Sequence, residues 1–170
     1  MSNVPSPEMI ALLARAMVVI DRPEQIQAPV LKRLFAYWSS KRADGQPPPR
    51  TAIDPADLRD ILPYLWLVDV EREPWRFRFR LVGTKITEWA GREYTGRYVE
   101  TEAYGPQAPT IAAQYREVAE RCLPMWHQQH APWIGREFRF YEKVMLPLLA
   151  PGGNVGMLLC AMSMTSAPAP

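Results

Sequence analysis

Apolar and charged side chains alternate most clearly within the segment from Pro74 to Arg97. The apolar positions of this alternation are Trp75, Phe77, Phe79 and Leu81, and the positions between them are arginines. A period of two predicts a strand with one apolar face and one basic face. Gly83 ends this strand, and a short helix is expected after it. A strand that runs directly into a short helix indicates a sheet covered by small helices.

Helical spacing of apolar residues marks other parts of the chain. A first helix is expected to open at Pro7 and to be broken at Asp21. A second is predicted over residues 29–41, a short one from Asp54 to Pro63, and a longer one over 110–122. Asp54 is expected to cap the short helix, with proline in its first turn.

Strand patterns occupy two separate parts of the sequence. Residues 64–70 are expected to pair with 75–82 as a hairpin, and residues 136–149 with 155–164 around a turn rich in glycine. Residues 125–132 are expected to be extended. Strands grouped at both ends with helices between them favour an antiparallel α+β domain. The prolines at 47–49 suggest a connector, which divides the chain into a helical extension (1–46), a core domain (47–165) and a disordered tail (166–170).

Composition narrows the classes of function. The chain has 170 residues, a net charge of +2 and 48% hydrophobic residues, which suits one domain with a substantial core. So small a charge, with acidic residues scattered among the basic ones, argues against nucleic acid as a partner. The sequence shows no membrane span and no secretory signal, so a cytoplasmic protein with two reduced cysteines is expected.

Several short motifs together resemble one known family, the PAS domains, and in particular the stand-alone PAS-like domains of alphaproteobacteria, formerly a domain of unknown function. The motifs, in chain order, are Tyr37-Trp38 with Lys41-Arg42, Ile53-Asp54-Pro55 with Leu62-Pro63, residues 79–84, Gly91-Arg92-Glu93 with Thr95-Gly96, and residues 146–148. The resemblance spans roughly residues 30–162. It implies a five-stranded antiparallel sheet with helices across one face, and a role in sensing or protein contacts without a known catalytic set.

The histidines and cysteines are the first candidates for cofactor chemistry. If their segment were helical, the H-x-x-H spacing could put His127 and His130 on one face near one metal, but two histidines without a third ligand make a poor zinc site, so no metal is expected. Haem bound through either histidine is a minority possibility. Some relatives in the PAS superfamily hold flavin through a cysteine motif, and Cys122 beside Pro124 does not match it. No cofactor is favoured.

An apolar pocket between sheet and helices is the main candidate binding site. Its candidate residues are Phe79, Leu81, Ile86, Trp89, Tyr94, Tyr115, Val144 and Leu146. The same side chains could instead simply fill the core. Arg80, Gly83 and Glu93 are expected to order the turn between strand and helix, with Arg80 facing Glu93. Arg76 and Arg78 are expected to form a solvated or salt-bridged strand face opposite Glu71 or Glu142.

The expected function is a cytoplasmic, non-catalytic sensory module that binds a small apolar or aromatic ligand, contacts a signalling partner, or does both. The alternatives are a pure interaction scaffold with a filled core and a small isomerase-like enzyme that uses a carboxylate and a tyrosine in its cavity. A homodimer is also expected. Its candidate contact is an apolar helical stripe, which would otherwise pack on the outer face of the sheet: Leu31, Leu34, Phe35 and Trp38.

Overall fold

A computed structural model of the protein describes residues 6–8, 17–100, 105–130 and 140–165. Most of the predicted first helix, the start of the strand expected from residue 136 and the tail at 166–170 lie outside these residues.

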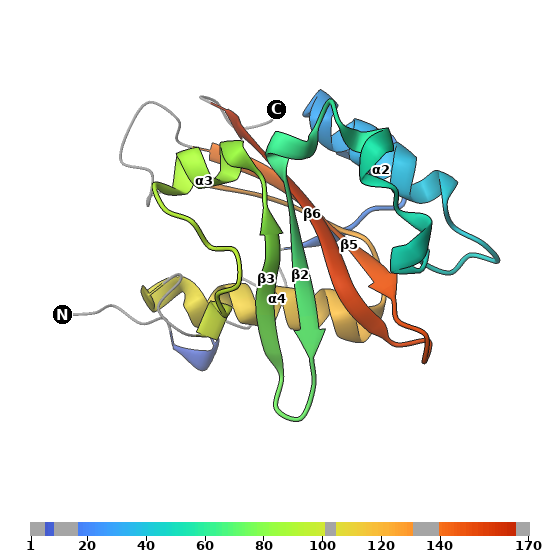
Figure 1. Cartoon of the computed structure of the whole chain (residues 1–170). Helices are drawn as coiled ribbons and strands as arrows, with labels where there is room; N and C mark the ends of the chain where they lie inside the picture. Colours follow the sequence, from blue (N-terminus) through green and yellow to red (C-terminus); the bar gives the residue numbers. More distant parts are fainter. Residues whose placement is uncertain (1–5, 9–16, 101–104, 131–139, 166–170) are drawn as a thin grey trace.

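A six-stranded antiparallel sheet organises the described part of the chain (Figure 1). Its strands are β1 (Val18–Val19), β2 (Leu65–Glu71), β3 (Arg76–Val82), β4 (Met125–His130), β5 (Phe140–Leu149) and β6 (Val155–Thr165). Their order across the sheet is β1-β4-β5-β6-β2-β3. The early hairpin β2–β3 joins the late hairpin β5–β6 because β2 pairs with β6, with Trp66 opposite Cys160. The prediction that both hairpins form one sheet is therefore confirmed.

The sixth strand, β1, is an addition to the five strands that the resemblance implied. Val18 and Val19 pair with Trp126 and Met125 of β4, and the Ile20 amide donates to the Pro124 carbonyl at 2.9 Å. The helical spacing read from Pro7 to Asp21 was thus wrong for these two residues. Their β-branched side chains suit a short strand at the edge of a sheet.

The predicted helices at 29–41, after Gly83 and at 110–122 are present, whereas the short helix expected from Asp54 to Pro63 is replaced by separate 3₁₀ turns. The helices are α2 (Pro29–Ser40), α3 (Thr84–Ala90) and α4 (Ala108–Arg121), together with the 3₁₀ turns η1 (Pro23–Gln25), η2 (Arg50–Ala52), η3 (Pro55–Leu58), η4 (Leu62–Tyr64) and η6 (Gly105–Gln107). The Asp54 carboxylate accepts a hydrogen bond from the Ala56 amide at 2.8 Å, so the predicted cap is confirmed at the start of η3.

Both faces of the sheet are covered, and each carries its own apolar cluster. We call the face that packs against α4 the inner face, and the face that packs against α2 the outer face. Figure 1 shows α4 crossing behind β2 and β3, while α2 lies near β5 and β6, which it contacts. A strand buried on both faces loses the alternation of apolar and polar residues, and β5 is therefore buried along nearly its whole length.

Candidate functional site

Four polar side chains are buried together on the inner face, between the sheet and α4. They are Thr110 and Gln114 from α4, His127 from β4 and Lys143 from β5, and none is more than 5% exposed. We call these four residues the inner polar cluster. Polar groups buried at this depth are normally hydrogen-bonded, because losing water without a replacement partner costs free energy.

The backbone brings the four residues of the cluster together. His127 lies directly opposite Lys143 in the β4–β5 register, and residues opposite each other point to the same face. Thr110 and Gln114 are one helical turn apart, which places them on one side of α4. The Lys143 Nζ donates to the Gln114 Oε1 at 2.6 Å, which joins the strand pair to the helix.

The cluster is incompletely satisfied. The Nδ1 of His127 and the Oγ1 of Thr110 are buried atoms without a hydrogen-bond partner. Burial lowers the pKa of Lys143 to about 8, because the charged ammonium loses its hydration. Burial, with the nearby Lys143 charge, lowers the pKa of His127 to about 3. At neutral pH the imidazole is therefore uncharged and the lysine is mostly protonated.

Apolar and aromatic side chains surround the cluster. Tyr141 stands edge-on to His127 with ring centroids 6.0 Å apart, and its hydroxyl donates to the Gln129 Oε1 at 3.1 Å. Cys160 lies beside Lys143 from β6, and burial raises the pKa values of both Cys160 and Tyr141. At pH 7 the Cys160 thiol and the Tyr141 hydroxyl are thus neutral. Among the described residues around the cluster, the charge is carried by the Lys143 ammonium.

The structure brings together five of the eight predicted pocket residues. Phe79, Ile86, Trp89, Tyr94 and Tyr115 all pack in the apolar cluster of the inner face. Phe79 and Tyr94 have ring centroids 5.6 Å apart, and the Tyr115 hydroxyl accepts from Trp66 Nε1 at 2.9 Å.

The other three predicted pocket residues lie elsewhere, which corrects that part of the prediction. Val144 and Leu146 belong to the outer cluster, since on β5 they alternate with the inward-facing Lys143. Leu81 is 44% exposed. The β2–β3 register shifts by one residue before Leu81, and a shift of one residue moves the following side chain to the other face.

Arg80 does not face Glu93 as predicted. Its Nε lies 2.7 Å from the Asp69 Oδ1, and Arg78 binds the other oxygen of the same carboxylate at 2.9 Å. The Glu93 Oε1 instead accepts from the amide and hydroxyl of Thr95, which lowers the pKa of Glu93. Arg78 and Arg80 therefore form a salt-bridged strand face around a buried aspartate.

Two further expectations concern Glu142 and Gly83. Glu142 does not face the arginines, because it lies on the outer face and accepts from the amides of Gln27 and Ala28. Gly83 precedes α3, and its amide donates to the Leu65 carbonyl at 2.7 Å, so it ties the start of that helix to β2.

The two histidines of the H-x-x-H motif occupy β4, so the expected extended state is confirmed for residues 125–130. The spacing that would place both on one helical face therefore does not apply. Within the described residues, no three His, Cys, Asp or Glu side chains come together as metal ligands would.

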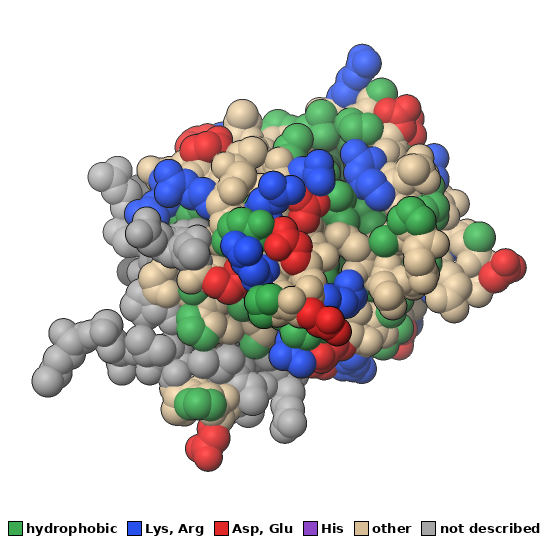
Figure 2. Space-filling view, turned by 60° about the horizontal axis from the view of Figure 1, so that its bottom comes forward, with side chains coloured by type: hydrophobic (Ala, Val, Ile, Leu, Met, Phe, Trp, Pro, Cys, Tyr) green, Lys and Arg blue, Asp and Glu red, His purple; other side chains and the backbone are tan. Residues whose placement is uncertain are grey.

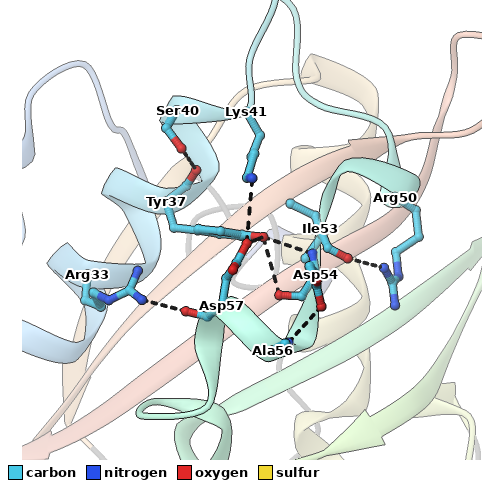
Figure 3. Close-up of polar contacts among 9 residues, drawn as sticks. All are labelled: Arg33, Tyr37, Ser40, Lys41, Arg50, Ile53, Asp54, Ala56 and Asp57. Atoms are coloured by element: carbon cyan, nitrogen blue, oxygen red, sulfur yellow. Dashed lines mark hydrogen bonds and ion pairs between the residues drawn. The ribbon is translucent and has the colours of Figure 1, made fainter.

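The motif residues near the start of the chain form a polar network between α2 and the η2–η3 segment (Figure 3). The Tyr37 hydroxyl accepts from the Asp54 amide at 2.9 Å and donates to the Asp57 Oδ2 at 3.1 Å. The Lys41 Nζ lies 4.9 Å from the centre of the Tyr37 ring, and the Arg50 Nη1 donates to the Ile53 carbonyl at 2.9 Å. These motif residues hold α2 against the rest of the fold.

Charges of both signs are interspersed on the face seen in Figure 2, where Lys and Arg side chains stand beside Asp and Glu side chains. No continuous basic area is visible on that face. Among the described residues, no helix has the length and apolar character needed to cross a membrane.

Sequence reasoning missed Lys143, Gln114 and Thr110 as site residues. The available signal was the adjacent pair Glu142-Lys143 inside an otherwise apolar strand. Neighbouring residues of a strand point to opposite faces. Two adjacent charged residues in a strand covered on both sides therefore bury one charge on each face, which is unusual for charged side chains.

Comparisons with known proteins agree with this architecture. The family model described as PAS domain matches residues 26–163. No curated protein matches the chain. One solved structure that matches the chain is an RNA-binding light-oxygen-voltage receptor, with 14% sequence identity and a TM-score of 0.48. That alignment covers 88% of this chain and 38% of the receptor, so the chain spans well under half of the receptor's length. Because the family model covers most of the sequence, this protein belongs to the PAS domain family and is a sensory or signalling module in that general sense.

Proposed function

We propose that this PAS domain is a non-catalytic sensor that binds a small molecule between α4 and the inner face of the sheet. The observation that carries the proposal is the pair of buried, unpartnered polar atoms, His127 Nδ1 and Thr110 Oγ1. A core that only fills space would gain stability from apolar side chains at these positions, because an unsatisfied buried polar group costs about 1–3 kcal/mol. A ligand that hydrogen-bonds to them would remove this cost.

The surroundings favour a ligand with an apolar or aromatic body. Small-molecule sites are mostly apolar with a few polar groups that fix orientation. Tyr115 packs on the same inner face as the cluster and neighbours Gln114 on α4. Phe79, Ile86, Trp89 and Tyr94 extend the apolar surface toward α3.

A route from this site to a partner surface runs through β5. Lys143 faces inward, and the adjacent Glu142 binds the amides of Gln27 and Ala28, just before α2. A ligand that shifts β5 would therefore move the start of α2, and α2 with η3 would present the change to a signalling protein. A cytoplasmic location and a homodimer remain part of this proposal.

The surface for such a dimer has to be other than the predicted apolar stripe. Leu31, Leu34, Phe35 and Trp38 are buried against the chain's own β5 and β6. Light scattering that finds only monomer at high concentration would remove the dimer from the proposal.

Native mass spectrometry of gently purified protein tests ligand binding directly, and an absorbance spectrum of the same sample would reveal haem or flavin. A fragment library screened by thermal shift is a second test of ligand binding. We expect a retained mass or a set of stabilising fragments, and weaker binding of these by Thr110→Val. Thr51→Val, at an exposed position, is the matched control and should bind normally. If nothing is retained and no fragment raises the melting temperature, the filled-core scaffold replaces the sensor.

A further inference from the structure

The charge balance around Lys143 is incomplete. Its ammonium is buried, and its hydrogen bond goes to the neutral amide oxygen of Gln114. The titratable groups that face it are His127 from β4, Tyr141 from β5 and Cys160 from β6. All of these are neutral at pH 7, and no Asp or Glu of the described residues pairs with this lysine. Buried charges in folded proteins are normally paired.

The nearest carboxylate in the sequence does not fill this role. Glu142 points to the outer face, where its Oε1 accepts from Gln27 and Trp126 and its Oε2 accepts from Ala28. Its position in the strand keeps it on the far side of the sheet from Lys143. The Lys143 ammonium is thus buried on the inner face, while the adjacent Glu142 carboxylate is hydrogen-bonded on the outer face.

We infer that the ligand of this domain is a small monocarboxylate with an apolar or aromatic body, whose carboxylate pairs with Lys143 in the inner polar cluster. This inference rests on the proposed function and specifies the ligand's chemistry. The Lys143 ammonium has N–H donors beyond its bond to Gln114. Thr110, one helical turn before Gln114 on α4, carries a buried hydroxyl without a hydrogen-bond partner, which can also donate.

The donor set distinguishes a carboxylate from other acceptor groups. One ammonium with neutral donors balances one negative charge, whereas a phosphate near −2 would remain half uncompensated in a buried site. A neutral carbonyl or amide could accept these hydrogen bonds but would leave the ammonium without a counter-ion. A charge-assisted hydrogen bond is also roughly twice as strong as a neutral one.

The inference predicts a pH dependence. A carboxylate needs the protonated lysine, and burial lowers the pKa of Lys143 to about 8 in the free protein. Affinity for a carboxylate should therefore fall above pH 8, approaching about tenfold per pH unit. Cys160 and Tyr141 do not titrate in this range, because burial raises their pKa values. His127, whose pKa is about 3, is already neutral there.

The test uses a panel of carboxylates: benzoate, phenylacetate, hexanoate and octanoate, each paired with its primary amide. Binding to the full chain is measured by thermal shift and calorimetry at pH 7 and pH 9.5. We expect at least one carboxylate to bind about ten- to a hundredfold more tightly than its amide. Lys143→Met should lose that difference, while Lys85→Met, at a surface lysine of α3 whose side chain is 42% exposed, should keep it. The wild-type pH series gives the same information without a variant that has to fold.

Three outcomes separate the proposals. If amides bind as tightly as their acids, or if Lys143→Met binds the acids as well as the wild type does, the carboxylate inference is wrong while the sensor proposal stands. Carboxylate binding that is unchanged at pH 9.5 would also overturn it. If no member of the panel binds, the carboxylate inference fails, and the retained mass and the fragment screen decide the sensor proposal separately.

Discussion

Glu142 offers the sharpest test of how the outer face is held together. Its side chain is 3% exposed and accepts three hydrogen bonds, from the Gln27 amide at 2.6 Å, the Ala28 amide at 2.8 Å and Trp126 Nε1 at 2.6 Å. Glu142→Gln keeps the shape of the side chain but replaces one acceptor oxygen with an amide nitrogen. If the remaining oxygen stays at the Oε1 position, the new nitrogen faces the Ala28 amide, and two donors oppose each other.

The magnitude follows from these three bonds. Hydrogen bonds to charged groups contribute about 1.5–3 kcal/mol and neutral ones about 0.5–1.5 kcal/mol. In the variant, the bonds from Gln27 and Trp126 lose their charge assistance, and the bond from Ala28 is lost. Burying a neutral glutamine costs less free energy than burying a carboxylate, which offsets part of this loss. We expect the free energy of unfolding to fall by about 3 kcal/mol. For a domain of this size, that corresponds to a melting temperature lower by about 6–12 °C.

Urea unfolding followed by tryptophan fluorescence and circular dichroism measures this change, with an unaltered dependence on urea concentration as the check on two-state behaviour. Glu88→Gln is the control, because Glu88 is exposed and pairs with Lys85 on the helix surface. A loss below about 0.5 kcal/mol for Glu142→Gln, which is the usual range for a surface substitution, would mean that the carboxylate does not hold the start of α2.

Two further substitutions test the inner face and the start of α3. Lys143→Met should raise the free energy of unfolding at pH 7, because an apolar side chain replaces a buried ammonium. The folded-state pKa of about 8 lies below the ordinary 10.5, so the unfolded chain binds more protons between these values and wild-type stability should rise from pH 8 to 10.5. The Lys143→Met variant should lack this rise in stability, which is at most about 3 kcal/mol. Urea denaturation at pH 8 and at pH 10.5 measures the rise in both proteins. An equal rise in the variant would contradict the assignment of the pH dependence to Lys143. Gly83→Ala places a methyl group 2.6 Å from a backbone carbonyl carbon of η4, and we expect a loss of about 3 kcal/mol or more. Gly152→Ala, where the methyl group meets nothing within 4 Å, is its control, and equal thermal stability of the two variants would refute the steric argument.

The sequence predicted the elements that have strong local periodicity. The helix at α2, the hairpin β2–β3 and the strand pair β5–β6 all follow from spacing and turn residues within one segment. Leu81 shows where such reasoning stops. The alternation places it with Phe79, but the register shift in the β2–β3 pair moves it to the surface. A bulge depends on how two strands pair, and the alternation of one strand does not contain that information.

The candidate site was harder to predict because its residues come from three distant segments. Thr110 and Gln114 look like ordinary polar positions on an amphipathic helix, and His127 belongs to a segment whose helical or extended state was ambiguous. Only the pairing of β4 with β5 and the packing of α4 across them place these side chains beside Lys143. The neighbouring Glu142 points to the outer face, where it accepts three hydrogen bonds, whereas Lys143 points to the inner face, where no Asp or Glu of the described residues pairs with it. A single step along β5, from Glu142 to Lys143, thus separates a hydrogen-bonded structural carboxylate from an ammonium without a counter-ion among the described residues. An apolar side chain at position 143 would be more stable than a buried ammonium without a counter-ion, and this difference is the physical argument on which the proposed ligand site rests.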